Sequence, residues 1–516
     1  MQNLPTSFRS ILFEPSNDEC TPLTIEPPAY FRDLNLDQIV DAITAGREEY
    51  NLLPLYYSRL TNPAQVAYRQ AIMLDLENHA LFTGIKSFSE QMSSVRRHLA
   101  AWQKQTHKYY QEGYFLHAVE MYCRAVIQLR RDLHEIGVNS RGLRTFYLYL
   151  QQYLRSDDFE TLARHSAQLR AELSAINYCL VLGDGWITVR NYDSEIDYGE
   201  VVEKTFAKFK QGAAKDYKVK LPDSSGMNHI EAQILDRVAT LNPDVFGSLD
   251  LFCAKHRDFF DDVIVAFDRE IQFYVAFHEY AGVFKRAGLK FCYPQVSDTD
   301  KHVSGRETFD WALAGKLIRN GSLVVRNDFS LKGCERICVV SGPNQGGKTT
   351  FARMFGQLHY LASLGYPVPG AEARIFLCDR LFTHFEKTED IATLHGKLQD
   401  DLIRIHRILE EAGGSSMVIM NEIFSSTSVE DGLYLGKKIM QRLSEIDVLG
   451  VCVTFLDELS RLNEKTVSMV AAIVPENPVL RTYRIERKPA DGLAYALAIA
   501  EKHRVTYQWL SRRLNP

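Results

Sequence analysis

A glycine-rich loop between a predicted strand and a predicted helix constrains the fold of this chain more than any other feature. The loop matches the pattern G-x-x-x-x-G-K-[ST] in full and reads Gly342-Pro343-Asn344-Gln345-Gly346-Gly347-Lys348-Thr349. The apolar run 337–340 precedes it and a helical stretch starts at Thr350, which is the context that the pattern requires. A loop in this context predicts an α/β domain that binds a nucleotide.

The residues of this loop have predictable roles toward ATP. Glycines let the backbone curl until its N–H groups point at phosphate oxygens, and the N-terminus of the following helix adds a favourable field. Lys348 would reach the β and γ phosphates, and the hydroxyl of Thr349 would ligate Mg²⁺. We therefore expect residues 342–350, up to and including Thr350, to bind ATP together with Mg²⁺.

A second predicted strand ends in polar residues. The apolar run 418–420 stops at Asn421 and Glu422, before a Ser/Thr loop. In P-loop ATPases such a strand end carries the carboxylates that position Mg²⁺ and activate water. Asn421 would hold Mg²⁺ through a bound water, more weakly than an Asp because its amide oxygen carries no charge, and Glu422 would be the general base. The alternative is that both residues only cap the end of a strand.

Apolar periodicity divides the chain into differently folded parts. At 516 residues the chain is too long for a single core, so we expect two or more domains. Apolar residues recur at three and four positions within 34–173 and 228–288, which predicts long helices. Two β-rich runs around Gly183-Asp184-Gly185 predict a hairpin inserted near 176–192. Pro, Ser, Asp and Gly accumulate in 291–305, which suggests a domain junction.

Beyond this junction, apolar runs alternate with helical stretches. The runs span 322–329, 336–341, 374–385, 415–424 and 448–459. Strands that alternate with helices predict an α/β domain with a largely parallel sheet. We therefore expect a helical domain over residues 1–300, with the β insertion, and a nucleotide-binding domain over residues 301–516.

Charge and cysteine content narrow the class of protein. The 60 basic and 65 acidic residues nearly balance, so net charge neither indicates nor excludes a nucleic-acid partner. The nine cysteines form no C-x-x-C pair, which predicts a reduced intracellular protein without a structural zinc site. The N-terminus lacks an export pattern and no apolar run reaches about 18 residues, so we expect a soluble, cytoplasmic protein with no membrane partner.

The motifs of the C-terminal part together resemble the MutS family of DNA mismatch-repair ATPases. The segments that match in order are VVRNDFSL, GPNQGGKTTF, LASLGYPVPGAEARI, DRLFTHFEKTEDIA, NEIFSSTSVEDGLYL and ADGLAYALAIAEK. The resemblance implies an ABC-type ATPase that dimerises, so that each copy helps to complete the other's site. The implied fold is an α-helical lever/core region with a small β insertion, followed by an α/β P-loop NTPase domain of ABC type.

Further residues acquire roles only through this resemblance. Asn327 and Asp328 would lie in the loop near the nucleotide base. The loop toward the dimer partner would comprise Ser425, Ser426, Thr427 and Ser428.

The chain also departs from the family at two further positions. An S-T-F-like element, whose Ser reaches the partner subunit's ATP, is replaced by Gly396-Lys397-Leu398-Gln399. Where the family usually ends a strand with Thr-His, this chain has Thr454-Phe455, so the histidine that would sense the γ phosphate is missing. Asp457 and Glu458 stand nearby without an assigned role. Together with Asn421, these departures suggest a slow hydrolase or a protein that mainly uses nucleotide binding.

The front of the chain is too short for the family's mismatch-reading domain and connector. Phe88-Ser89-Glu90 and Phe277-His278-Glu279 match the Phe-x-Glu wedge tripeptide, but both lie in helical patterns. A wedge has to project from a rim, so neither is expected to read mismatches. We expect a short MutS-like protein without a mismatch wedge or a nuclease domain.

A lysine-rich segment after the hairpin is the best candidate for contact with DNA. Its lysines alternate with Phe206, Phe209 and Tyr217, and they are Lys204, Lys208, Lys210, Lys215, Lys218 and Lys220. Such a segment can neutralise phosphates without reading sequence. The alternative is a solvated amphipathic face, which is favoured because Glu200, Glu203 and Asp216 interrupt the segment.

These observations predict an ATP-dependent DNA-binding protein. We expect a homodimeric clamp, closed through the ATPase domain, that acts in repair or recombination on damaged, mismatched or branched DNA, with a repair protein as a further partner. The competing hypothesis is a nucleotide-dependent scaffold or switch that binds a protein and hydrolyses little ATP.

Overall fold

A computed structural model describes residues 8–14, 24–193, 201, 204–205, 227–386, 396–424, 427–474, 477–490 and 506–514. The chain divides into two units. Unit 1 comprises Met1–Phe8, Asn78–Val138 and Leu143–Asp268. Unit 2 comprises Arg9–Glu77, Asn139–Gly142 and Arg269–Pro516, and therefore contains the glycine-rich loop.

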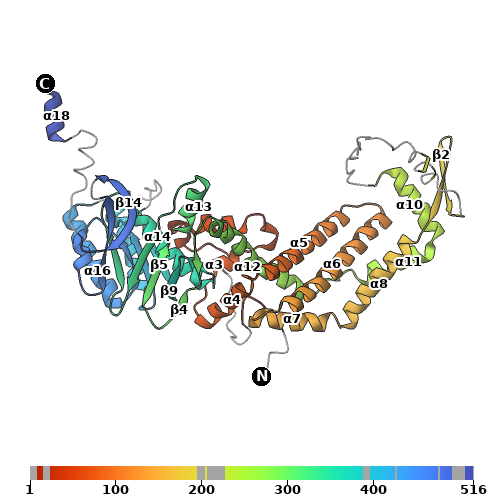
Figure 1. Cartoon of the computed structure of the whole chain (residues 1–516), viewed down its shortest axis with the longest axis horizontal. Coiled ribbons are helices and arrows are strands. Elements are labelled where there is room, and N and C mark those ends of the chain that lie inside the picture. The colour runs from red at the N-terminus through yellow and green to blue at the C-terminus, as the bar shows by residue number, and fades with distance from the viewer. Residues whose placement is uncertain are drawn as a thin grey trace. The chain divides into compact units, whose positions relative to one another are not determined.

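Unit 1 is built mainly from helices. They are α5 (His79–Trp102), α6 (Lys108–Ile136), α7 (Arg141–Tyr153), α8 (Asp157–Ser174), α10 (His229–Leu241), α11 (Pro243–Lys255) and the start of α12 (Asp262–Arg286). The helices α5 and α6 lie side by side (Figure 1).

The packing of α5 follows from the spacing of its apolar residues. Leu81, Ile85, Phe88, Met92 and Val95 recur at three and four positions, and all are buried. The helix begins where the Asn78 side chain accepts hydrogen bonds from the first free backbone N–H groups. The helical prediction for this part of the chain is confirmed.

The predicted hairpin is present in unit 1. Strand β1 (Tyr178–Gly183) pairs antiparallel with β2 (Trp186–Asn191) through the two-residue turn Asp184-Gly185. Gly185 has a φ of 81°, which the turn requires and glycine adopts without strain. Large apolar side chains remain exposed on the hairpin, Leu182 at 74% and Trp186 at 55%.

Unit 2 starts with short helices and small sheets. The helices are α1 (Tyr30–Asp33), α2 (Leu36–Thr44), η1 (Glu48–Tyr50), α3 (Leu53–Tyr57), α4 (Pro63–Asp75) and α13 (Trp311–Arg319). One sheet has the order β4 (Gln295–Ser297), β9 (Glu372–Phe376), β5 (Val303–Thr308), β6 (Asn327–Leu331), and β3 (Phe291–Cys292) pairs with β8 (Val368–Pro369).

The main sheet of unit 2 carries the site. Its described strands have the order β10 (Leu381–Phe385), β11 (Met417–Asn421), β12 (Leu449–Val453), β7 (Ile337–Ser341), β13 (Thr466–Val474), β14 (Asn477–Arg487). All neighbouring pairs are parallel except β13 with β14. The remaining elements are α14 (Lys348–Ser363), α15 (Lys397–Glu411), α16 (Val429–Ile446), η2 (Asp457–Arg461) and α18 (Tyr507–Leu514). The predicted mixture of helices with a largely parallel sheet is confirmed.

Both faces of this sheet are covered, so its central strands are continuously apolar. Val418 and Met420 of β11 belong to a buried cluster with residues of α15 and α16. The intervening Ile419 points to the opposite face, where it meets Gly356 of α14. This double coverage explains why β7, β11 and β12 are buried along their whole length.

The structure refines two of the predicted apolar runs. The run 374–385 was given as one apolar run, and it forms β9 and β10, which belong to different sheets. The run 322–329 becomes strand only from Asn327. In addition, 291–305 contributes β3, β4 and the start of β5 to unit 2. The proposed domain limits at 300 and 301 stay a prediction.

None of the described helices combines the length and apolar character that a membrane-crossing helix requires.

Candidate nucleotide-binding site

The glycine-rich loop lies where β7 ends and α14 begins, at the edge where the parallel strands β11 and β12 also end. Gly347 has a φ of 93°, a left-handed conformation that favours glycine. At Gly346, a Cβ atom would lie 2.9 Å from both the Cβ atom of Ala471 and the carbonyl oxygen of Pro343. The local backbone therefore requires glycine at both positions.

Thr349 and Asn421 meet across this edge. The Thr349 hydroxyl donates a hydrogen bond of 2.9 Å to the Asn421 amide oxygen, although the two residues are 72 positions apart. Asn421 is 7% exposed and ends β11. The two predicted metal-binding residues thus lie together, and their oxygens are of the hard type that Mg²⁺ prefers.

Lys348 is buried and its ammonium is enclosed by the loop. Its Nζ atom donates to the carbonyl oxygens of Gly342 at 2.9 Å and Pro343 at 3.2 Å. Burial lowers the pKa of Lys348, while the nearby Glu422 acts in the opposite direction. A buried cation in a loop of backbone N–H groups suits the phosphates of a nucleotide.

Glu422 lies directly after β11 and is held by its neighbouring strand. Its backbone N–H donates to the carbonyl oxygen of Val453 at 2.9 Å. Partial burial raises the pKa of the Glu422 carboxyl, opposed by Lys348 and reinforced by Glu386. A raised pKa makes this carboxylate a stronger base, which is the property that a general base needs.

Lys348, Thr349 and Glu422 line one pocket of about 320 Å³, whereas Asn421 lies behind them and does not line it. The lining residues are Leu313, Gln345, Gly346, Gly347, Lys348, Thr349, Thr350, Glu422 and Tyr483. Gln345, Glu422 and Tyr483 have positive φ angles of 59°, 54° and 58°. Left-handed backbone is uncommon for such residues and gathers at functional sites. The strain in this pocket is an independent reason to regard it as the functional site.

The comparison with known protein families concerns the same region. Residues 338–511 match the family model described as MutS domain V. The C-terminal part of the chain is therefore similar to a domain of MutS proteins.

Curated MutS relatives match only in part. The DNA mismatch repair protein MutS of Erythrobacter litoralis is 31% identical over 229 residues, which are 43% of this chain and 26% of that protein. The protein of the same name from Syntrophomonas wolfei is 33% identical over 181 residues, 34% of this chain and 21% of that protein. The protein from Lawsonia intracellularis is 33% identical over 186 residues, 35% of this chain and 21% of that protein. The matched part therefore spans about a quarter or less of these relatives.

Two residues that line the pocket of the glycine-rich loop were missed by sequence reasoning. Tyr483 comes from β14 and Leu313 from α13, on the opposite side of the loop in the sequence. From the same strand, Arg481 donates through Nε to the carbonyl oxygen of Asn344 at 3.2 Å. No motif marks these positions. Tyr483 reaches the loop through the pairing of β14 with β13, and Leu313 through the contact of α13 with α14.

Asn327 and Asp328 line a different pocket of about 390 Å³ beside β14. The Asn327 amide donates to the Tyr483 carbonyl oxygen at 3.3 Å and accepts from the Ile485 N–H at 2.7 Å. Asp328 accepts from the N–H of Glu307 at 2.6 Å. The bonds of Asn327 tie β6 to β14 and the bond of Asp328 ties β6 to β5. A role for the two residues toward a nucleotide base stays a prediction.

The positions that depart from the MutS pattern are partly described. Gly396 precedes α15, whose first residues are Lys397, Leu398 and Gln399. Ser428 caps α16 by accepting from the N–H of Asp431 at 3.2 Å. Ser425 and Ser426 lie outside the described residues, so the loop expected to reach a dimer partner is only partly visible.

The two Phe-x-Glu tripeptides lie on helices with their rings in the interior. Phe88 on α5 and Phe277 on α12 are each 1% exposed. Neither ring can be inserted between base pairs from these positions. Except for Lys204, the lysines of the predicted DNA-binding segment lie outside the described residues, as do Phe206, Phe209 and Tyr217.

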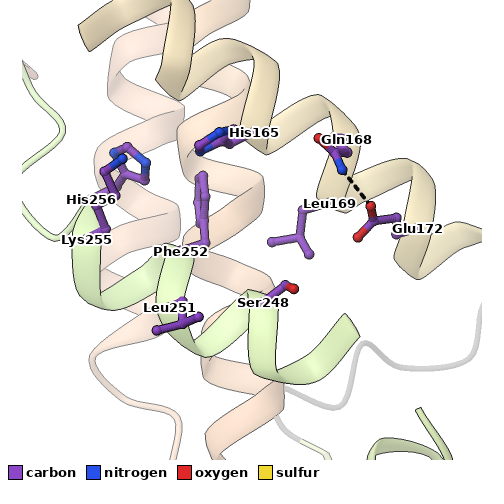
Figure 2. Close-up of a pocket in the computed structure, with 9 residues that line it drawn as sticks. All are labelled: His165, Gln168, Leu169, Glu172, Ser248, Leu251, Phe252, Lys255 and His256. Carbon is purple, nitrogen blue, oxygen red and sulfur yellow. Dashed lines mark hydrogen bonds between the residues drawn. The ribbon is translucent and has the colours of Figure 1, made fainter. Parts of the chain in front are cut away.

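A further pocket of about 310 Å³ lies in unit 1 between α8 and α11 (Figure 2). His165 and His256 face each other there, with ring centroids 6.2 Å apart. Gln168 donates to Glu172 at 2.8 Å on the opposite part of the rim. None of the residues that the sequence singled out lines this pocket.

Proposed function

We propose that this chain is an ATP-dependent DNA-binding ATPase that acts in DNA repair or recombination. The observation that carries the proposal is the 2.9 Å hydrogen bond between Thr349 and Asn421 at the mouth of the glycine-rich loop, with Glu422 as the next residue. A hydroxyl and an amide oxygen that can hold Mg²⁺, with a carboxylate that can act as general base, lie together at the end of β11, and this supports ATP hydrolysis with an amide in place of the usual Asp.

Each residue has a proposed role in the reaction. Residues 342–350 bind the phosphates through the backbone N–H groups that all of them except Pro343 carry, and Lys348 pairs with the β and γ phosphates. Thr349 and Asn421 hold Mg²⁺, which when bound neutralises charge that develops on the phosphates. Glu422 orients the attacking water and accepts its proton.

DNA is the proposed macromolecular partner, because the similar curated proteins are named DNA mismatch repair proteins. We propose a homodimer closed through residues 301–516, which clamps damaged, mismatched or branched DNA without a dedicated wedge. The burial of Phe88 and Phe277 supports the absence of a wedge at these tripeptides. Residues 1–300 would act as the lever that couples nucleotide binding to the grip on DNA.

Steady-state ATP hydrolysis tests this proposal. Glu422→Gln is expected to lower the rate by about 10²-fold or more, since it removes the general base, while ATP binding is retained. Glu430→Gln is a matched control, because Glu430 is an exposed glutamate on α16 that lines no pocket described above. The wild-type rate is expected to rise with branched DNA. Equal rates for wild type and Glu422→Gln would contradict the assignment of the base.

A second function is favoured by two specific residues. Asn421 lacks the charge of an Asp, and Phe455 lacks a hydrogen-bonding group toward a phosphate. A scaffold that binds ATP, hydrolyses little of it and recruits a repair protein would need neither group. Tight ATP binding without turnover in the wild type, and without any response to DNA, would favour this function.

A further inference from the structure

The ammonium of Lys348 has a partner that does not belong to the glycine-rich loop. Its Nζ atom lies 4.3 Å from the centroid of the Phe455 ring. Its other partners are the carbonyl oxygens of Gly342 and Pro343 and, at 3.5 Å, the Oδ1 atom of Asn344. An ammonium has three donors, so the loop oxygens and the ring face together complete its surroundings.

The position of Phe455 is fixed by its two neighbours. Thr454 is 3% exposed, and its N–H donates to the carbonyl oxygen of Val340 at 3.0 Å, which extends the pairing of β12 with β7. Its hydroxyl accepts from the N–H of Leu456 at 3.0 Å, and Leu456 packs against the buried cluster of the sheet. The ring itself is 49% exposed. A half-exposed ring on an anchored backbone is held over Lys348 without being part of the core.

Phosphate oxygens can pair with this ammonium only by replacing one of its present partners. The carbonyl oxygens belong to the loop that has to surround the phosphates, whereas Phe455 comes from the end of a different strand. We propose that Phe455 is a positioning residue that holds Lys348 against the loop carbonyls and has to release it before ATP is bound tightly. This inference rests on the proposed function and identifies Phe455 as a residue that sets affinity for the nucleotide.

In this proposal, Phe455 holds Lys348 through the π face of its ring and not through the volume of its side chain. Fluorine atoms withdraw electron density from the ring and weaken its attraction for a cation, while the shape changes little. Two variants are to be made, with 4-fluorophenylalanine or 3,4,5-trifluorophenylalanine in place of Phe455. They should bind ATP more tightly than the wild type, and the trifluoro variant should bind more tightly than the monofluoro variant. For the trifluoro variant we expect a dissociation constant about three- to tenfold lower than that of the wild type.

The dissociation constants are to be measured by calorimetry with the nonhydrolysable analogue AMP-PNP and Mg²⁺, on the full chain. Phe455→Leu provides a second variant and should also bind more tightly. Tyr434→Leu is the matched control, since Tyr434 is 63% exposed on α16 and its ring lies 5.9 Å from the ammonium of Lys438. This control should bind like the wild type.

The outcomes separate the inference from the proposed function. If the wild type binds AMP-PNP, Lys348→Met does not, and affinity follows the number of fluorine atoms, the inference is supported. If binding requires Lys348 but all Phe455 variants bind within twofold of the wild type or more weakly, the inference alone is overturned. If the wild type binds no AMP-PNP, the proposed function falls and the inference falls with it.

Discussion

At the scale of single residues, we expect Asn421 to determine how strongly the proposed site holds a metal ion. Its amide oxygen accepts the Thr349 hydroxyl at 2.9 Å, so the two proposed metal-binding side chains lie together without the usual negative charge. Charge strengthens such contacts most where water is excluded, and Asn421 is buried. The metal requirement of this protein should therefore respond to one substitution.

Asn421→Asp is expected to lower the Mg²⁺ concentration needed for half-maximal ATP binding on the order of tenfold, because it adds a charge at a buried position. A Mg²⁺ titration of ATP binding measures this. Asn421→Ala, which removes the amide that bonds to Thr349, should raise the concentration needed. An identical Mg²⁺ dependence for all three proteins would show that Asn421 is not a metal-binding residue.

Much of the site could be predicted at this scale, and the reason is local. Lys348, Thr349 and Glu422 lie within or directly after sequence motifs, and the motifs predict that these side chains lie at one site. The proximity of Thr349 to Asn421 followed from two strand ends at one sheet edge. The position of Tyr483 in the pocket and the contact of the Phe455 ring with Lys348 depend on tertiary packing. The spacing of residues in the sequence does not predict them.

At the scale of elements, β12 approaches β11 so closely that one of its positions excludes a side chain. A Cβ atom on Gly450 would lie 1.9 Å from the carbonyl oxygen of Val418 on the paired strand. Because the backbone of a central strand is held by its neighbours on both sides, a side chain at position 450 would force β11 and β12 apart.

Gly450→Ala is expected to destabilise the protein by about 3 kcal/mol, as measured by urea unfolding followed by circular dichroism. Gly432→Ala on α16 is the matched control, because its Cβ atom would have no neighbour nearer than 3.7 Å. In a helix this change should leave stability equal or raise it by about 0.5–1 kcal/mol. Equal free energies of unfolding for the two variants would show that the close approach of β11 and β12 does not restrict the residue at position 450.

Asp447 joins several elements at the end of α16. Its carboxylate accepts from Lys301 at 2.6 Å, Lys465 at 2.7 Å and Arg336 at 3.0 Å. Partial burial opposes ionisation, but hydrogen bonds from these three cations outweigh it and hold the pKa of Asp447 well below its usual range. A carboxyl with a depressed pKa stabilises the fold above its unfolded-state pKa and loses this contribution as the pH falls through its folded-state pKa.

Asp447→Asn should destabilise the protein at pH 7 by about 1–2 kcal/mol, allowing for solvent screening at a position that is one-third exposed. Asn tolerates the left-handed backbone at this position, where φ is 67°, so the substitution removes the charge and one of the two accepting oxygens without straining the backbone. Thermal unfolding from pH 7 downward should show the difference narrowing below about pH 4. A difference that stays constant down to pH 2 would contradict the ion-pair account.

The elements themselves were predictable where turn chemistry or periodicity marks them. The hairpin β1–β2 followed from its Gly-Asp-Gly turn, and α5 from its apolar spacing. The run 374–385 could not be divided from the sequence, because two strands joined by a short segment give one apolar stretch. The composition of this stretch does not indicate that the chain passes from one sheet to another between β9 and β10.

At the scale of the whole molecule, the chain builds its units from interleaved segments. Residues 9–77 and 269–516 belong to one unit, although residues 78–138 and 143–268 of the other unit lie between them in the sequence. Apolar spacing in the sequence predicts that a segment is helical, but it does not predict which other segments the helix packs against. The interleaving of the two units could therefore not be predicted. In the account proposed above, nucleotide bound in unit 2 changes the grip on DNA.

The most direct test of this claim is DNA binding with and without nucleotide. Fluorescence anisotropy of a labelled branched DNA should be measured at low salt for the wild type and for Lys348→Met, each with AMP-PNP and Mg²⁺ or with neither. We expect the analogue to change the wild-type affinity at least severalfold and to leave Lys348→Met unaffected, because that variant cannot hold the phosphates. The account would be contradicted if the wild type bound DNA with the same affinity with and without AMP-PNP, or if it bound no DNA under any of these conditions.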